Sequence, residues 1–289
     1  MKRSIIFNPL IDVEEARLQA HYLSRVIEDG LFPMIEIWDT MDSATLELCK
    51  ENSTDIEFDV SLSPLMAQCE YDLVSDNPVI LQRSIDYTLK RIEALSAIGI
   101  HHISISSPRV SNSSYDRCSK IAQFAEVIYK VCEFAQNGDI LISLEGFDVS
   151  VDKKRLLGTT LELDAFLGKL QSEVNNLSLT WDLGHIGLEE KNYLPSLLKL
   201  KKYIRHVHLS NYSLDSEKWY FGDKHLPFLI EDGIKLSDLK TIITYISDSP
   251  EISIAFEVAS NRRVVECDTF LKTYKYVLQL FEILDTEKY

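Results

Sequence analysis

Apolar runs of strand length alternate with longer segments of helical period along almost the whole chain, and this alternation constrains the fold more than any other feature. Repeated strand–helix units predict a parallel sheet covered by helices. Eight repeats favour a closed (β/α)8 barrel (a TIM barrel), a single α/β domain over residues 1–289. An open doubly wound sheet is the alternative, but no GxGxxG motif follows the first run. The eight runs are 4–10, 35–39, 56–63, 102–107, 140–145, 177–182, 204–209 and 252–258.

Two of the intervening segments carry clear helix signals. Asn77 and Pro78 have the character of an N-cap and a first-turn proline, and the segment that follows runs to Gly99. The segment 114–136 repeats apolar residues at helical spacing. Both patterns predict long helices between strands of the barrel.

Within the strand runs, large apolar residues occupy one parity and small or polar residues the other. In run 177–182, Leu179 and Trp181 alternate with Thr180 and Asp182. Because strand side chains alternate between faces, the apolar parity should meet the helices and the polar parity should point into the barrel. The same division holds in three further runs: 102–107, 140–145 and 252–258.

Charge and composition narrow the classes of partner. The chain has 45 acidic and 30 basic residues, a formal net charge of −15, which disfavours nucleic acid and anionic membranes as partners. No apolar stretch approaches the roughly 18 residues that a membrane helix requires. The five cysteines show no CxxC spacing, which favours a reducing compartment, and we expect a cytoplasmic protein.

Ionizable residues stand at the ends of the later strand runs. The carboxyl ends of parallel strands converge at the mouth of such a barrel, where this fold places its active sites. Carboxylates forced together there repel one another unless a cation neutralises them. Three carboxylates and one imidazole form a mixed O/N ligand set suited to Mn²⁺, Mg²⁺, Co²⁺, Zn²⁺ or Fe²⁺. The ionizable residues at these strand ends are three carboxylates and three histidines: Glu145 in LISLEGFD, Asp182 and His185 in LTWDLGH, His206 and His208 in RHVHLSN, and Glu257 in IAFEV.

The motifs LEGFD, WDLGH, HVHLSN, GDKHLP and FEV, in this order, resemble those of the xylose-isomerase-like TIM-barrel superfamily. That superfamily includes sugar isomerases and epimerases, hydroxypyruvate isomerase, inosose dehydratase and the type-four AP endonucleases. The resemblance implies that one divalent metal ion is bound by Glu145, Asp182, His208 and Glu257. It also implies that Glu145 and Glu257 are catalytic proton carriers and that His185 contacts the oxygens of the substrate.

Further residues are candidates for a second ion or for the substrate. In the endonuclease branch, an Asp-x-His in the place of GDKHLP binds additional zinc, so Asp223 and His225 are candidates for a second metal. Two basic clusters, DKKRLLG and SNRRVV, are candidates for pairing with an anionic group, and loop charges exposed to solvent are the alternative. The candidate substrate-binding residues are His185, His206, Lys154, Arg155 and Arg262.

These residues predict a metal-dependent sugar, sugar-phosphate or polyol isomerase or epimerase. Proton transfer would pass through a metal-stabilised enediolate, with a small sugar or sugar derivative as substrate. A metal-dependent lyase or hydrolase (a dehydratase or an endonuclease-like phosphodiesterase) is the alternative, and a non-catalytic binding barrel is a further one. DNA repair is disfavoured because Ser61 or Ser63, and Ser106, stand where the three-zinc pattern needs histidines. The sequence leaves open which metal binds and whether the chain forms a homo-oligomer.

Overall fold

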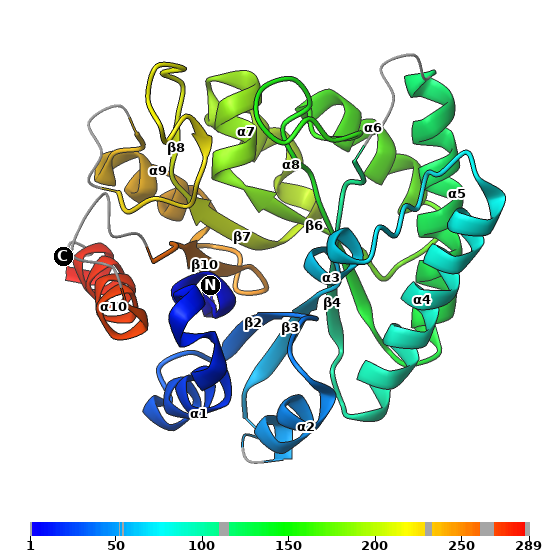
Figure 1. Cartoon of the computed structure of the whole chain (residues 1–289). Helices are drawn as coiled ribbons and strands as arrows, with labels where there is room; N and C mark the ends of the chain where they lie inside the picture. The colour runs from blue at the N-terminus through cyan, green and yellow to red at the C-terminus, as the bar shows by residue number, and fades with distance from the viewer. Residues whose placement is uncertain are drawn as a thin grey trace.

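Eight parallel strands close into one barrel, as the sequence predicts (Figure 1). The computed structural model describes residues 2–51, 53, 55–109, 116–228, 233–260 and 269–286. The strands follow the spatial order β1-β10-β7-β6-β5-β4-β3-β2. Their bounds are β1 Lys2–Ile6, β2 Met34–Trp38, β3 Glu57–Ser61, β4 His102–Ser106, β5 Leu141–Glu145, β6 Leu177–Asp182, β7 Ile204–Ser210 and β10 Ser253–Glu257.

Only the first strand departs noticeably from its predicted bounds. The chain leaves the sheet after Ile6 and forms a 3-10 turn, η1, at Asn8–Leu10. Pro9 lies in the first turn of η1 and has no backbone N–H for a sheet ladder. The predicted run 4–10 therefore extends too far.

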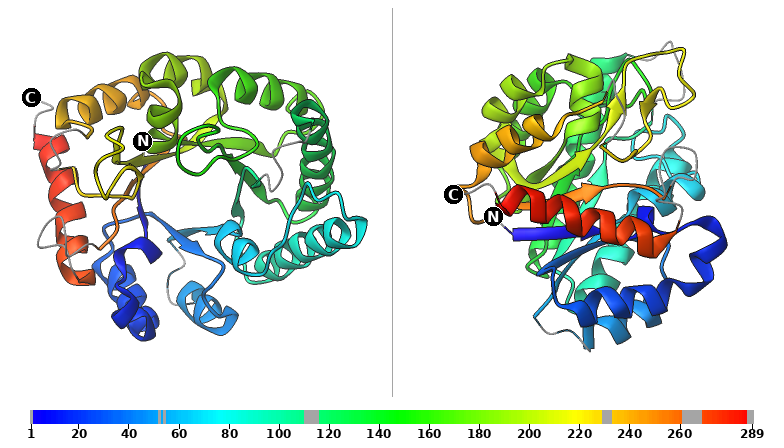
Figure 2. Two further views of the ribbon diagram at one scale, coloured as in Figure 1. Left: turned by 45° about the horizontal axis from the view of Figure 1, so that its top comes forward. Right: turned by 90° about the vertical axis from the view of Figure 1, so that its left-hand side faces the viewer.

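Helices surround the strands on the outside of the barrel (Figures 1 and 2). The predicted start at Asn77 is confirmed, because its side chain accepts a hydrogen bond from the backbone N–H of Val79 at 2.9 Å. The helices are α1 Gln19–Asp29, α2 Ser43–Glu51, α3 Ser63–Gln68, α4 Pro78–Ala97, α5 Arg117–Gln136, α6 Thr160–Leu170, α7 Leu183–Glu190, α8 Tyr193–Leu200, α9 Leu236–Ile246 and α10 Phe270–Thr286, with 3-10 turns η2 Val13–Leu18 and η3 Lys201–Tyr203. None of the helices described here combines the length and hydropathy that crossing a bilayer requires.

The two faces of the strands differ as the parity of the sequence predicts. On the outer face, the Trp181 ring is buried and its Nε1 donates to Ser196 Oγ of α8 at 3.1 Å. On the inner face, the hydroxyls of Ser143 and Thr180 lie 2.7 Å apart. The centre of the barrel is therefore polar and hydrogen-bonded between neighbouring strands.

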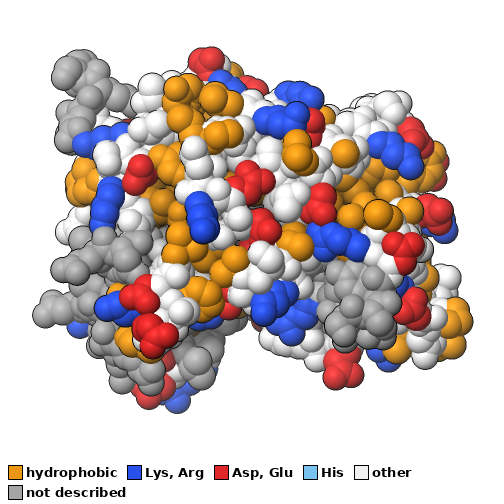
Figure 3. All heavy atoms as spheres, turned by 90° about the horizontal axis from the view of Figure 1, so that it is seen from above, with side chains coloured by type: hydrophobic (Ala, Val, Ile, Leu, Met, Phe, Trp, Pro, Cys, Tyr) orange, Lys and Arg blue, Asp and Glu red, His pale blue; other side chains and the backbone are white. Residues whose placement is uncertain are grey.

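A small two-stranded antiparallel sheet follows β7. It pairs β8 (Tyr212–Ser213) with β9 (Gly222–Asp223) and places Asp223 beside α7, which β9 contacts. On the face of the molecule shown in Figure 3, acidic and basic side chains lie interspersed. The functional candidates are therefore to be sought inside the barrel mouth.

Candidate metal centre

Asp182 is fixed by the sharp junction between β6 and α7. It is the last residue of β6 and the N-cap of α7, where its Oδ1 accepts from the backbone N–H of His185 at 3.0 Å. The hydroxyl of Ser210, at the end of β7, donates to the same oxygen at 2.8 Å. Gly184 has no room for a side chain, because a Cβ there would lie 2.3 Å from Ser210 Oγ. This packing explains the local sequence WDLGH.

Four side chains from four strands converge at the mouth. The Nδ1 of His208 lies 3.1 Å from Glu145 Oε1, 3.4 Å from Glu257 Oε2 and 3.6 Å from Asp182 Oδ2. All four residues are buried, and one ligand atom from each lies within 4.8 Å of the others. Asp182 Oδ2 is buried and has no hydrogen-bond partner, so it is free to coordinate a cation. The ligand types and their convergence fit a divalent metal ion.

The electrostatics of the cluster also fit a cation. Burial alone would lower the pKa of His208, but the surrounding carboxylates outweigh it and raise that pKa well above its ordinary value. Burial raises the pKa of Glu257, although His225 and His208 oppose the shift. Several buried carboxylates therefore share a single imidazole, and a divalent cation would balance their charge.

Glu36 is the functional candidate that sequence reasoning missed. Its Oε2 lies 2.7 Å from Nε2 of His208, on the side of the ring away from the cluster, and 3.2 Å from Nε2 of His206. Burial would raise the pKa of Glu36, but the two histidines hold it below its ordinary value. A carboxylate on the second nitrogen of a metal-binding histidine fixes the orientation of the ring. In the sequence, Glu36 stands between Ile35 and Ile37, so the alternation of strand side chains places its carboxylate on the inner face of the barrel.

His185 lies beside the cluster and faces two further carboxylates. Its ring packs against that of Phe147 in a tilted arrangement with centroids 3.9 Å apart, and its Nδ1 is 3.6 Å from both Asp148 Oδ1 and Asp223 Oδ2. Burial would lower the pKa of His185, but Asp182, Asp223 and Asp148 raise it to about 9. A protonated imidazole at this place can donate a hydrogen bond to a substrate oxygen.

The predicted second metal pair lies on the far side of Glu257. His225 Nδ1 is 3.4 Å from Asp223 Oδ1 and 3.5 Å from Glu257 Oε1. Among the described residues, neither Asp223 nor His225 belongs to the groups whose ligand atoms converge closely enough for an ion. A second metal at this pair stays a prediction.

Each glutamate of the cluster turns one oxygen toward His208 and the other toward a different neighbour. Glu145 Oε2 accepts a hydrogen bond from Ser106 Oγ at 3.0 Å. Glu257 Oε1 is the oxygen that faces His225. Ser106 thus orients Glu145 at the place where the endonuclease pattern needs a histidine.

The remaining predicted substrate-binding residues lie in different environments. His206 is fully buried beneath His208, with its Nδ1 2.5 Å from Ser253 Oγ. Lys154 is exposed, whereas Arg155 is partly buried with its guanidinium carbon 5.1 Å from the centre of the Phe147 ring. Arg262 lies outside the described residues.

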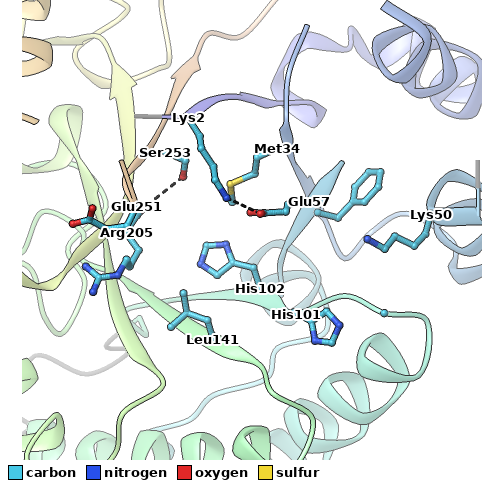
Figure 4. A pocket seen from close by; sticks show the side chains of 12 residues that line it. Lys2, Met34, Lys50, Glu57, His101, His102, Leu141, Arg205, Glu251 and Ser253 are labelled. Carbon is cyan, nitrogen blue, oxygen red and sulfur yellow. Dashed lines mark hydrogen bonds and ion pairs between the residues drawn. The ribbon is translucent and has the colours of Figure 1, made fainter. Parts of the chain in front are cut away.

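A cavity of about 380 Å³ opens at the N-terminal end of the barrel, opposite the mouth (Figure 4). His101 and His102 line it, as expected for residues at the start of their strand. His102 Nδ1 lies 3.3 Å from Asp59 Oδ2, and Lys2 pairs with Glu57 at 2.6 Å. These histidines therefore lie at the N-terminal end of the barrel, away from the mouth.

Comparisons with known proteins agree with the architecture. A family model described as xylose isomerase-like TIM barrel matches residues 25–261. No curated protein sequence matches the chain significantly. Among solved structures, a D-psicose 3-epimerase from Clostridium cellulolyticum H10 with D-tagatose has a TM-score of 0.71 at 14% identity, covering 99% of each chain. An L-ribulose 3-epimerase has a TM-score of 0.71 at 17% identity over 99% of this chain and 95% of its own. A 3-keto-D-glucoside 4-epimerase from E. coli has a TM-score of 0.69 at 12% identity over 99% of each.

Proposed function

The chain belongs to the xylose isomerase-like TIM barrel family, and from this premise we propose that it is a metal-dependent sugar isomerase or epimerase. The observation that carries the proposal is the convergence of Glu145, Asp182, His208 and Glu257 at the barrel mouth. The solved structures of similar fold described as sugar epimerases support it.

The four converging residues would hold the metal ion, and Glu36 would orient His208 from behind. The chemistry that such a cation supplies when bound is Lewis-acid polarisation of a substrate carbonyl. Polarisation acidifies the neighbouring C–H bond, so the remaining requirement is a carboxylate that can accept the proton and return it.

Glu145 and Glu257 are the proposed proton carriers. Each has one oxygen directed away from His208, toward Ser106 in one case and His225 in the other. Burial raises the pKa of Glu257 in the metal-free protein, and with a metal bound the oxygen that faces His225 would stay available to accept the proton. Removal and return by one glutamate would move the carbonyl between neighbouring carbons, whereas return by the opposite glutamate would invert a stereocentre.

His185 is the proposed anchor for a substrate oxygen. In the metal-free protein the surrounding aspartates raise its pKa to about 9. Asp223 and Asp148 lie outside the proposed four-residue ligand set, so they would still favour the protonated imidazole with the metal bound. The Phe147 ring, which is tilted against the imidazole, restricts its movement. A fixed, charged donor would position the carbon-bound proton relative to the two glutamates.

A lyase or hydrolase on the same centre is the second candidate function. The observation that favours it is that Asp223 Oδ2 and His225 Nδ1 are buried without a hydrogen-bond partner. A second ion there would add a water-activating site. Two equivalents of metal per chain, with one lost in Asp223→Asn, would support this candidate instead.

The test combines metal content with hydrogen exchange at carbon. The metal-loaded protein is incubated with ketoses and aldoses in D₂O, and solvent deuterium at the carbon next to the carbonyl is followed by NMR. We expect one divalent ion per chain and exchange that is lost in Glu145→Gln and Glu257→Gln. Glu57→Gln, an exposed acid at the other end of the barrel, is the matched control and should keep both. Absence of bound metal, or exchange that survives in both mouth variants, would contradict the proposal.

A further inference from the structure

The loop between β5 and α6 folds tightly against the loop after β4. The backbone N–H of Phe147 donates to Leu157 O at 3.2 Å, and that of Leu156 donates to Pro108 O at 3.0 Å. Gly158 permits the close approach, because a Cβ there would lie 1.6 Å from the carbonyl oxygen of Phe147. Arg155 directly precedes these contacts and its own backbone N–H donates to Asp148 O at 3.0 Å, so it is held in a defined place.

This packing sets Arg155 directly against Arg109. The two residues form an isolated antiparallel bridge between the loops. Burial and the neighbouring Arg109 lower the pKa of Arg155 to about 10. Arg155 Nε is buried and has no hydrogen-bond partner. Within the described part of the chain, neither guanidinium lies within 4.0 Å of a carboxylate. Glu145 and Asp148 act on Arg155 electrostatically from beyond that distance and partly oppose the lowering of its pKa. Two adjacent guanidinium groups with no carboxylate in direct contact favour an anion that contacts both.

The two arginines also line a cavity of about 470 Å³ that adjoins the proposed centre through Ser106. Ser106 lines the same cavity and donates to Glu145 Oε2. Arg155 approaches the centre from a second direction, because Phe147 lies under its guanidinium and packs against the His185 ring. A ligand in this cavity can therefore contact the two arginines and Ser106, the residue that donates a hydrogen bond to Glu145.

The rest of the cavity suits a polyhydroxylated chain. Its wall includes the side chains of Tyr71 and Ser75 together with the carboxylates of Glu70 and Asp72. Carboxylates and hydroxyls accept hydrogen bonds from sugar hydroxyls. The cavity thus offers cationic groups on one side and hydrogen-bond acceptors on another.

We propose that the substrate is an anionic sugar derivative whose carboxylate or phosphate binds Arg109 and Arg155 while its carbonyl end lies beside Glu145. This inference rests on the proposed function and narrows its substrate class. A neutral ketose would leave both guanidinium groups without an anion in direct contact, so it would bind more weakly. Arg155 acts as a binding and specificity residue, and proton transfer stays with the glutamates.

The binding test uses three unreactive ligands of similar length: D-gluconate, sorbitol 6-phosphate and neutral sorbitol. Calorimetric titration of the metal-loaded protein should show one of the two anions binding about tenfold or more tightly than sorbitol, and the tighter anion identifies the charged group. Arg155→Gln and Arg109→Gln should each weaken that anion about tenfold and leave sorbitol unchanged. Arg155→Lys should restore part of the lost affinity, because lysine keeps the positive charge but lacks the paired N–H donors of the guanidinium group.

Arg25→Gln removes the same charge from an exposed position on α1 and is the matched control, which should change nothing. Circular dichroism and melting temperature check that each variant is folded. Equal affinity for sorbitol and both anions, or equal losses in Arg25→Gln and Arg155→Gln, would overturn the inference.

Turnover separates failure of the inference from failure of the proposed function. If neutral ketoses exchange deuterium with an unchanged KM in Arg155→Gln, and anionic sugars gain nothing, the inference fails and the isomerase proposal stands. If the anions bind through the two arginines but neither neutral nor anionic sugars exchange deuterium, the anion site stands and the isomerase proposal fails. A higher KM for the anionic sugar alone in Arg155→Gln, at nearly unchanged kcat, supports both.

Discussion

The two ends of the barrel both bring histidines and carboxylates together, but the charges are balanced at the N-terminal end and predominantly negative at the mouth. At the N-terminal end, His102 faces a single carboxylate, Asp59, and Lys2 pairs with Glu57. At the mouth, His208 is surrounded by several carboxylates. The inward-facing strand residues are polar at both ends of the barrel. The two ends therefore differ in the negative charge that remains uncompensated at the mouth. That excess is what a cation would neutralise, and it distinguishes a candidate metal centre from structural polarity.

The largest expected effect comes from removing a glutamate at the mouth. Glu257→Gln should lower turnover by about 100- to 10,000-fold, because the amide can neither accept a proton nor supply the same ligand charge. Rates measured at saturating metal separate the two losses. If Glu57→Gln, at the N-terminal end of the barrel, lowers turnover as much as Glu257→Gln does, the contrast between the two ends is wrong.

The second prediction concerns the carboxylate behind His208. Glu36→Gln should weaken metal binding by about 10- to 100-fold, because the ring nitrogen loses the partner that fixes its orientation. Competition with a chromogenic chelator measures the affinity. Asp59→Asn replaces the neighbouring inward acid, which pairs in register with Glu36, and is the control. Similar losses in both variants would show that lumen charge in general, rather than Glu36, supports the centre.

The sequence predicts the strands and the ionizable residues at their carboxyl ends because both depend on short-range signals, whereas the choice of His208 over His185 and His206 as a ligand comes from the resemblance to the superfamily. Strand parity shows which side chains point inward, and the carboxyl ends of parallel strands meet at one mouth. Glu145, Asp182, His208 and Glu257 are each the last or a late inward residue of their strand, and the structure brings all four together.

The residues that the sequence did not reveal depend on contacts between distant segments. Glu36 meets His208 across the barrel, 172 positions away along the chain. The depth at which a strand residue sits in the lumen is set by strand tilt and register rather than by local pattern. Arg109 pairs with Arg155 through loop packing around Gly158, and periodicity carries no information about that packing.

The third prediction is a pH dependence of metal affinity. The carboxylates raise the pKa of His208 in the metal-free protein, so its proton must leave before the ring can bind a metal. Affinity should therefore increase with pH, by up to about tenfold per unit below that pKa, and level off above it. Calorimetry in buffers of different ionisation enthalpy would report the released proton. An affinity that is constant between pH 5 and 8, with no proton release, would contradict the assignment of His208 as a ligand.

The smallest effect at the mouth should come from a change at the balanced end. Ser104 Oγ donates to Asp59 Oδ1 at 3.0 Å, and Asp59 Oδ2 is buried without a hydrogen-bond partner. Ser104→Ala should lower the free energy of unfolding by about 1–3 kcal/mol, because it leaves a buried acceptor unsatisfied. Urea denaturation measures that loss, while metal affinity should stay unchanged. A loss of metal affinity in Ser104→Ala would show that the two ends are coupled through the lumen, so that charge balance at one end could not be considered apart from the other.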